Sequence, residues 1–187
     1  SNWIRRRIQG NTPVTEMYFS NNSGGNWRKF GTVNFKAGGE VRTVDTVAWM
    51  PVFLGGPANP IGLLPITTAT PPGLPPPSYD DSDAVHLPGG GSLGQRFTEF
   101  DRHAIYAVHP ANWAYLIAPD IVANDVKVTR DGGKTWHTSA GLTAQVRRGG
   151  ALNLWGGKPD LMQVTEIAFD PYNPRRILVG TRDAGII

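Results

Sequence analysis

Two aspartates, Asp120 and Asp183, occupy corresponding places in a repeated pattern and are the side chains best suited to catalysis. Each follows the second strand expected in its repeat, 120 − 110 = 10 and 183 − 171 = 12 residues after a proline that ends the first strand. Glycoside hydrolysis needs two carboxyl groups, an acid and a base or nucleophile, across a cleft. Asp120 and Asp183 are therefore the candidate catalytic pair. The alternative is that both only close turns.

Other reactive groups are excluded or weak. The chain has no cysteine, which removes disulfides, thiol catalysis and thiolate metal sites. Its four histidines lack metal-ligand spacing. The stretch 89–94 has the letters of the dinucleotide fingerprint, but a proline precedes it and a strand-like segment follows, so the required strand and helix are missing. The acidic run 80–83 lacks the spacing of an EF-hand loop. No metal and no cofactor are predicted.

Composition favours an all-β domain. The 187 residues include 23 Gly and 16 Pro, which break the sequence into many short apolar runs. The net charge of +3 is spread over short arginine clusters that lie far apart, so nucleic acid is not a predicted partner. No apolar run approaches the ~20 residues of a membrane span.

Two eight-residue stretches share one turn template, Ser/Thr-x-Asp/Asn-x-Gly-x-Thr/Asn-Trp. They are SNNSGGNW at 20–27 and TRDGGKTW at 129–136. The template predicts a tight hairpin. The Asx side chain accepts from turn amides, the glycine takes a positive φ, and the tryptophan buries its ring. We expect a structural role for the template residues Ser20, Asn22, Gly24, Trp27, Thr129, Asp131, Gly133 and Trp136.

A second motif repeats along the chain. Ala-apolar-x-Pro begins at residues 48, 107 and 168, with separations of 107 − 48 = 59 and 168 − 107 = 61. A Pro-x-Asn element and another apolar strand follow each copy. The unit predicts a four-stranded antiparallel propeller blade. About three blades are expected in an incomplete ring. Residues 1–35 are the end of a blade, 41–100 a blade with a Pro-rich surface insertion at 64–88, 102–163 a blade plus a loop insertion, and 164–187 the start of the next.

The turn template resembles the Asp-box, or BNR repeat, of sialidase-like and sortilin-like propellers and of family 74 glycosidases. The resemblance implies that residues 1–187 are a partial β-propeller from a larger protein, extracellular or at the cell surface. Residues 177–185 also resemble the strand-turn segment of family 74 xyloglucanases, whose catalytic Asp precedes a Gly there. The sialidase signature Phe/Tyr-Arg-Ile-Pro is missing, so sialidase activity is not expected.

The leading functional hypothesis is a non-catalytic binding or scaffold module whose partner is a glycan or a protein, including the remaining blades of the same protein or a large assembly. Binding is expected at the inserted loops and at aromatic side chains, because aromatic faces stack on sugars and anchor protein interfaces. The candidate binding residues are Trp113, Tyr115, Trp155, Arg147 and Arg148. Core packing of the aromatic residues is the open alternative. The alternative function is a glycoside hydrolase fragment acting on β-glucan or xyloglucan through Asp120 and Asp183.

Overall fold

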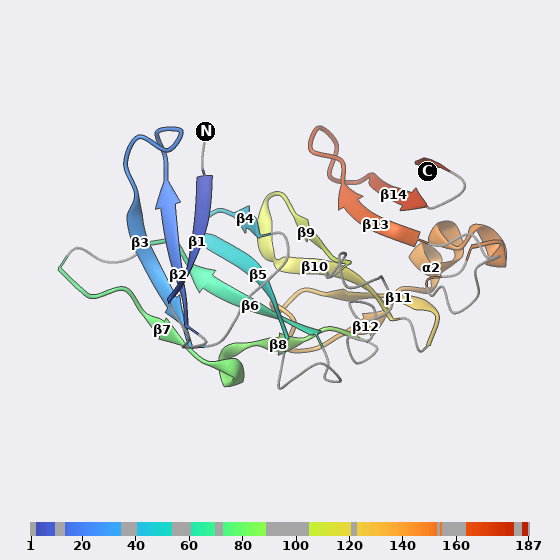
Figure 1. The fold of residues 1–187 in the computed structure, drawn as a ribbon. Helices are drawn as coiled ribbons and strands as arrows, with labels where there is room; N and C mark the ends of the chain where they lie inside the picture. Colours follow the sequence, from blue (N-terminus) through green and yellow to red (C-terminus); the bar gives the residue numbers. More distant parts are fainter. Residues whose placement is uncertain are drawn as a thin grey trace.

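A computed structural model describes most of the chain as short strands arranged in four sheets (Figure 1). The described residues are 3–9, 14–34, 41–53, 61–69, 73–88, 105–120, 123–152, 154, 164–181 and 185–186. Within them the fold is mostly β, as the composition predicts, with one short α-helix. The sheets form a row and do not close into a ring, and the propeller itself stays a prediction.

The first two sheets come from the amino-terminal half. Sheet 1 has the order β1-β2-β3-β7, with strands at Trp3–Gln9, Val14–Ser20, Arg28–Val33 and Ser78–Tyr79. Sheet 2 has the order β4-β5-β6-β8, with strands at Arg42–Val44, Val47–Phe53, Ile61–Thr67 and Val85–His86. All pairs are antiparallel except β3 with β7, which is parallel.

The other two sheets follow in the same way. Sheet 3 has the order β9-β10-β11-β12, with strands at Ala107–His109, Asn112–Asp120, Asp125–Thr129 and His137–Thr138. Sheet 4 has three described strands in the order β13-β14-β15, at Val164–Phe169, Ile177–Thr181 and Gly185–Ile186. Both sheets are antiparallel throughout. Sheets 3 and 4 are therefore meanders of consecutive strands. Sheets 1 and 2 each begin as a three-stranded meander, and β7 and β8 join their edges after the chain has passed through β6.

The sheets stand side by side in chain order, from sheet 1 at the left of Figure 1 to sheet 4 at the right. The first strands of sheets 2, 3 and 4 lie side by side, because β9 contacts both β4 and β13. Apolar side chains fill the spaces between sheets in three clusters. One cluster joins sheets 1 and 2, one joins sheets 2 and 3, and one joins sheets 3 and 4.

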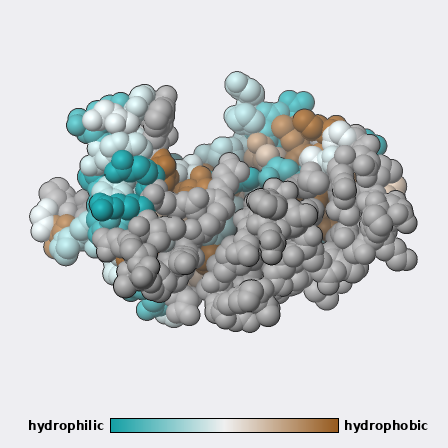
Figure 2. Space-filling model, in the orientation of Figure 1, coloured by the Kyte–Doolittle hydropathy of each residue, from teal (hydrophilic) through white to brown (hydrophobic). Residues whose placement is uncertain are grey.

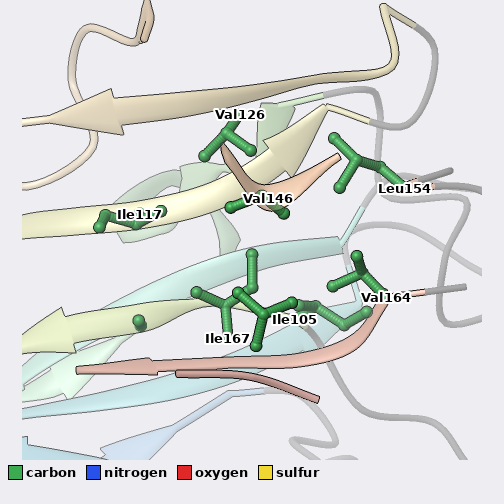
Figure 3. Packing of buried hydrophobic residues seen from close by; sticks show 9 residues of the cluster. Ile105, Ile117, Val126, Val146, Leu154, Val164 and Ile167 are labelled. Carbon is green, nitrogen blue, oxygen red and sulfur yellow. The ribbon is translucent and has the colours of Figure 1, made fainter. Parts of the chain in front are cut away.

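The cluster between sheets 3 and 4 also includes the helix α2, Ala140–Val146 (Figure 3). Val146 packs among Ile117 and Val126 of sheet 3 and Ile167 of sheet 4. The Thr143 hydroxyl accepts from the Val126 amide at 2.9 Å, which fastens the helix to β11. The expected loop insertion after sheet 3 therefore begins with a helix that packs on the core, and packing accounts for this part of the insertion.

The Pro-rich segment 64–88 is not only a surface insertion, as the sequence suggested. Its first residues belong to β6, its middle adds β7 to the edge of sheet 1, and its end adds β8 to the edge of sheet 2. A 3-10 helix, η1 (Asp81–Asp83), separates the two short strands. The Tyr79 hydroxyl accepts from the Thr67 amide at 3.2 Å, so the segment bridges the two sheets.

One of the three copies of the Ala-apolar-x-Pro motif does not lie in the first strand of its sheet. The copies at Ala107 and Ala168 end the first strands of their sheets, as predicted. The copy at Ala48 lies in β5, the second strand of sheet 2, and Pro51 pairs with Leu63 inside that strand. The first strand of sheet 2 is instead β4, which carries no such motif. None of the described helices is long and apolar enough to cross a membrane.

Gly133 provides a test of how tightly the turn between β11 and β12 contacts sheet 2. It has φ +87°, and a Cβ there would lie 2.6 Å from Val85 Cγ2. We expect Gly133→Ala to lower the free energy of unfolding by about 2–4 kcal/mol, from backbone strain plus overpacking. Gly73→Ala is the control, because Gly73 has φ +82° with no atom within 4 Å of the added Cβ. It should cost only about 1–2 kcal/mol. Equal losses in urea unfolding would contradict the contact.

Candidate functional site

The turns at 20–27 and 129–136 have the same hydrogen bonds. In the first, Ser20 Oγ accepts from the Gly24 amide at 2.9 Å, and Asn22 Oδ1 accepts from the Asn26 amide at 2.8 Å. In the second, Thr129 Oγ1 accepts from the Gly133 amide and Asp131 Oδ1 accepts from the Thr135 amide, both at 3.0 Å. In each turn the hydroxyl also donates to the Asx oxygen.

Positive φ angles also recur at matching places. Gly24 and Gly133 have φ 89° and 87°, and the residues before them, Ser23 and Gly132, are left-handed as well. The turns therefore follow the local geometry that the template predicts. Their Asx side chains are used in holding the turn.

The tryptophans that end the two turns differ from the prediction of a buried ring. Trp27 and Trp136 are only half-buried. The Arg5 guanidinium lies 4.9 Å from the Trp27 ring centroid, so this tryptophan packs against β1 of its own sheet. Trp136 packs against the cluster between sheets 2 and 3, and its Nε1 donates to the His86 carbonyl at 3.2 Å. Its role is to join two sheets.

The candidate binding residues Trp113 and Tyr115 point to opposite sides of β10. Simple alternation would place them on one face, but the register of β9 with β10 shifts between Asn112 and Leu116. Trp113 packs toward sheet 2, with its ring centroid 6.2 Å from that of Trp49. Tyr115 packs toward sheet 4, with its centroid 5.5 Å from that of Phe169.

Tyr115 is held in a cluster and presents little free ring surface. His109 stacks on it with centroids 5.3 Å apart and an interplanar angle of 18°. Arg130 places its guanidinium 4.3 Å from the Tyr115 centroid. Phe169 closes the cluster edge-on against both His109 and Tyr115. Tyr115 is thus a support for the exposed Arg130 more than a platform for a ligand.

Trp113 combines exposure with a fixed position. Its side of β10 leaves it 39% exposed, the largest exposure among the described tryptophans. A Cβ added to Gly132 would lie 3.0 Å from Trp113 Cζ3, so the ring lies directly on the turn that carries Asp131. The Trp113 carbonyl accepts from Trp49 Nε1 at 3.0 Å. An exposed indole with a rigid support loses little conformational entropy on binding.

The remaining candidate binding residues do not join Trp113. Arg147 and Arg148 follow α2, which is fastened near Val126 at the far end of the β10–β11 pair. Arg147 Nε donates to the Leu152 carbonyl at 3.3 Å, and Arg148 is exposed. Trp155 lies outside the described residues. Among the described candidates, the two arginines are therefore separated from Trp113 and Tyr115.

Asp120 lies where β10 ends and takes part in the turn there. Its Oδ1 accepts from the Ala123 amide at 2.9 Å, and its Oδ2 lies 3.8 Å from Lys127 Nζ. Asp125, its partner across the strands, lies 3.2 Å from the same ammonium group. Asp183 lies outside the described residues, so the proposed catalytic pair is not placed. Among the described side chains, no group of three or more metal-ligating residues is found.

Arg42 is a central residue that the sequence patterns did not single out. It lies on β4, and its guanidinium donates to the Tyr106 carbonyl before β9, to the Ile167 carbonyl on β13, and to Glu166 Oε1 at 2.9 Å. It also lies 4.8 Å from the Tyr106 ring centroid. One side chain thus joins three sheets. Its partners are 64 to 125 residues away, so no local motif could reveal it.

Asp170, also missed, is a buried carboxylate in the β13–β14 turn. It accepts from the Tyr172 and Asn173 amides and pairs with Arg176 at 2.6 Å. The Asp-Pro-x-Asn sequence is the local signal that could have found it. The amide of Tyr172, with the Arg176 guanidinium, holds the pKa of Asp170 below its usual range.

Comparison with known proteins gives distant structural likenesses and no sequence match. No protein-family model and no curated protein matches the chain. The crystal structure of the GH74 enzyme of Niastella koreensis is similar with a TM-score of 0.41 and 14% sequence identity. The match covers 99% of this chain and 28% of that one, so the chain spans little more than a quarter of the enzyme's length. This likeness assigns neither a family nor an activity.

The two turns allow a test of how the stability of the protein depends on pH, because Asp131 in one turn corresponds to Asn22 in the other. Hydrogen bonds from Thr129 and then Thr135 hold the pKa of Asp131 well below its usual range. In the unfolded chain the pKa of an aspartate is about 4. Because the folded pKa of Asp131 is lower, its carboxylate stabilises the folded state fully above about pH 4, and this stabilisation is lost as the pH falls through the folded pKa.

We expect Asp131→Asn to shrink the loss of unfolding free energy between pH 7 and pH 2, measured in urea. Asn22→Asp is the reverse change and should enlarge that loss. Part of the loss of unfolding free energy at low pH will remain in both variants, because the pKa of Asp170 is lowered as well. An unchanged pH profile in Asp131→Asn would show that the turn carboxylate does not contribute.

Proposed function

We propose that this chain is a section of an Asp-box β-propeller that works as a non-catalytic binding module of a larger extracellular or cell-surface protein. Three features support the propeller. The sheets follow one another in chain order, the first strands of sheets 2, 3 and 4 adjoin, and sheets 1 and 3 carry turns with matched hydrogen bonds. The first strands of blades adjoin in this manner around a propeller axis.

The observation that carries the binding proposal is the exposed but supported ring of Trp113. Trp49 and Gly132 hold it in place, while the Arg130 guanidinium lies over Tyr115 on the other side of β10. An exposed indole face suits a glycan, because the apolar face of a sugar ring stacks on it. A protein partner would use the same ring as an anchor. We assign the glycan as the first ligand to test.

Three carboxylates in the described turns have a structural role, which supports binding more than catalysis at these positions. Asp120, Asp131 and Asp170 each accept hydrogen bonds from backbone amides of their own turns, and Asp120 and Asp170 also pair with a cation. A general acid needs a protonated carboxyl that is free to reach the substrate. The hydrolase alternative would rest on Asp120 together with Asp183.

The test is affinity electrophoresis of the protein in gels containing xyloglucan or β-glucan, with an assay for released reducing ends. We expect retardation without release of sugar. Trp113→Ala should weaken affinity about tenfold or more, a loss of about 1.4 kcal/mol. Tyr172→Ala is the matched control, since Tyr172 is 96% exposed and lies in the turn next to His109's cluster without a packed ring beneath it.

Several outcomes would contradict the proposal. Equal weakening by Tyr172→Ala would indicate nonspecific aromatic adhesion. Release of sugar that is abolished by Asp120→Asn or Asp183→Asn would support the hydrolase instead. Trp113→Phe is a control for stability, because it keeps an aromatic ring on Gly132. We expect its thermal unfolding to be unchanged.

A further inference from the structure

A groove between α2 and β14 has aliphatic side chains on its floor and arginines on its rim. None of the residues that line it contacts Trp113 in the proposed binding site. Leu142 and Val146 from the helix and Ile177 and Val179 from the strand form the floor. The groove has a volume of about 400 Å³, within the range of small-molecule sites. In Figure 2, hydrophobic atoms are exposed at the upper right, over β14, beside the hydrophilic atoms of the β13–β14 turn.

The rim carries Gln145, Arg175 and Arg176. Arg176 is neutralised, because its Nε and Nη2 both bond Asp170 Oδ2, at 2.7 and 2.6 Å. The Arg175 amide donates to Asn173 Oδ1 at 3.2 Å, which fixes the backbone there. Its guanidinium is exposed and forms no ion pair with the carboxylates that the structure describes, so it contributes a positive charge at the rim. Arg147 and Arg148 follow Val146 directly and add positive potential at this end of the helix. Two arginine pairs that are distant in sequence are thus brought to one region.

We propose that this groove binds an aliphatic carboxylate, with the alkyl chain on the four aliphatic side chains and the carboxylate on Arg175. The four floor side chains are aliphatic and offer a sugar neither an aromatic face nor a side-chain hydrogen bond, so they suit an alkyl chain better. An alkyl chain needs only apolar contact, which favours its burial in proportion to area. A charge-assisted bidentate bond to guanidinium then fixes the head group.

The test is titration of the full chain with sodium octanoate, followed by the shifts of backbone amide resonances in NMR spectra. We expect saturable shifts centred on 142–146 and 176–179. Arg175→Gln should weaken octanoate about tenfold, because the charge-assisted bond is lost. Leu142→Trp, which places a large ring over the floor, should abolish the shifts while Arg175→Gln only weakens them.

The matched control is Arg7→Gln, an exposed residue of β1 at the opposite end of the row of sheets, which makes the same change in net charge without changing the rim. It should leave affinity within about twofold, since an exposed distant charge acts weakly. Octylammonium should not bind. Equal weakening by both arginine variants, equal binding of octylammonium, or no saturation would overturn the proposal. Binding of a short acidic peptide in place of octanoate would also overturn it and point to a protein partner.

Discussion

The architecture depends on how the first strands of neighbouring sheets are held together, and Arg42 is the residue that does this for three sheets. Its guanidinium contacts the segment before β9 and the strand β13, while its own strand belongs to sheet 2. Four small sheets have little core each, so the apolar area between sheets supplies most of the burial. A partly buried cation is stable there if its donors have acceptors, and the carbonyls of Tyr106 and Ile167 together with Glu166 provide them.

The contacts farther from these first strands differ from one sheet junction to the next. Sheets 1 and 2 share the segment that contains β7 and β8, and Arg28 donates across them to the Thr68 carbonyl. Sheets 2 and 3 are joined by tryptophans, through Trp136 to His86 and Trp49 to Trp113. Sheets 3 and 4 enclose α2. These rigid junctions leave the turns and their neighbours to form surfaces, which is where binding proteins on repeated scaffolds place their contacts.

The local features could be predicted from the sequence. The turns around Asn22 and Asp131 depend on residues within eight positions of each other, so the pattern of oxygens and glycines was sufficient. The strands of sheets 3 and 4 followed from alternating apolar residues. The opposite directions of Trp113 and Tyr115 on β10 were not predictable, because a register shift interrupts the alternation of side chains.

The contacts between distant segments could not be predicted. Arg42 pairs with residues up to 125 positions away, and nothing in its neighbourhood marks it. The Pro-rich segment suggested a surface loop because prolines are poor in sheets, yet its two short strands lie at sheet edges, where proline nearby is tolerated. The motif at Ala48 predicted the end of a first strand, but its proline, Pro51, lies within β5, the second strand of sheet 2. Tertiary packing, and not local preference, decided each of these cases.

The most direct test of this account is hydrogen exchange of Arg42→Met, read by mass spectrometry on peptides from each sheet. Methionine keeps an apolar stem while removing every bond of the guanidinium. The account predicts faster exchange in β4, β9 and β13 together, with β1 and β2 unchanged, since sheet 1 contacts sheet 2 elsewhere. Faster exchange confined to β4 would contradict it and show that the first strands are held by apolar packing alone.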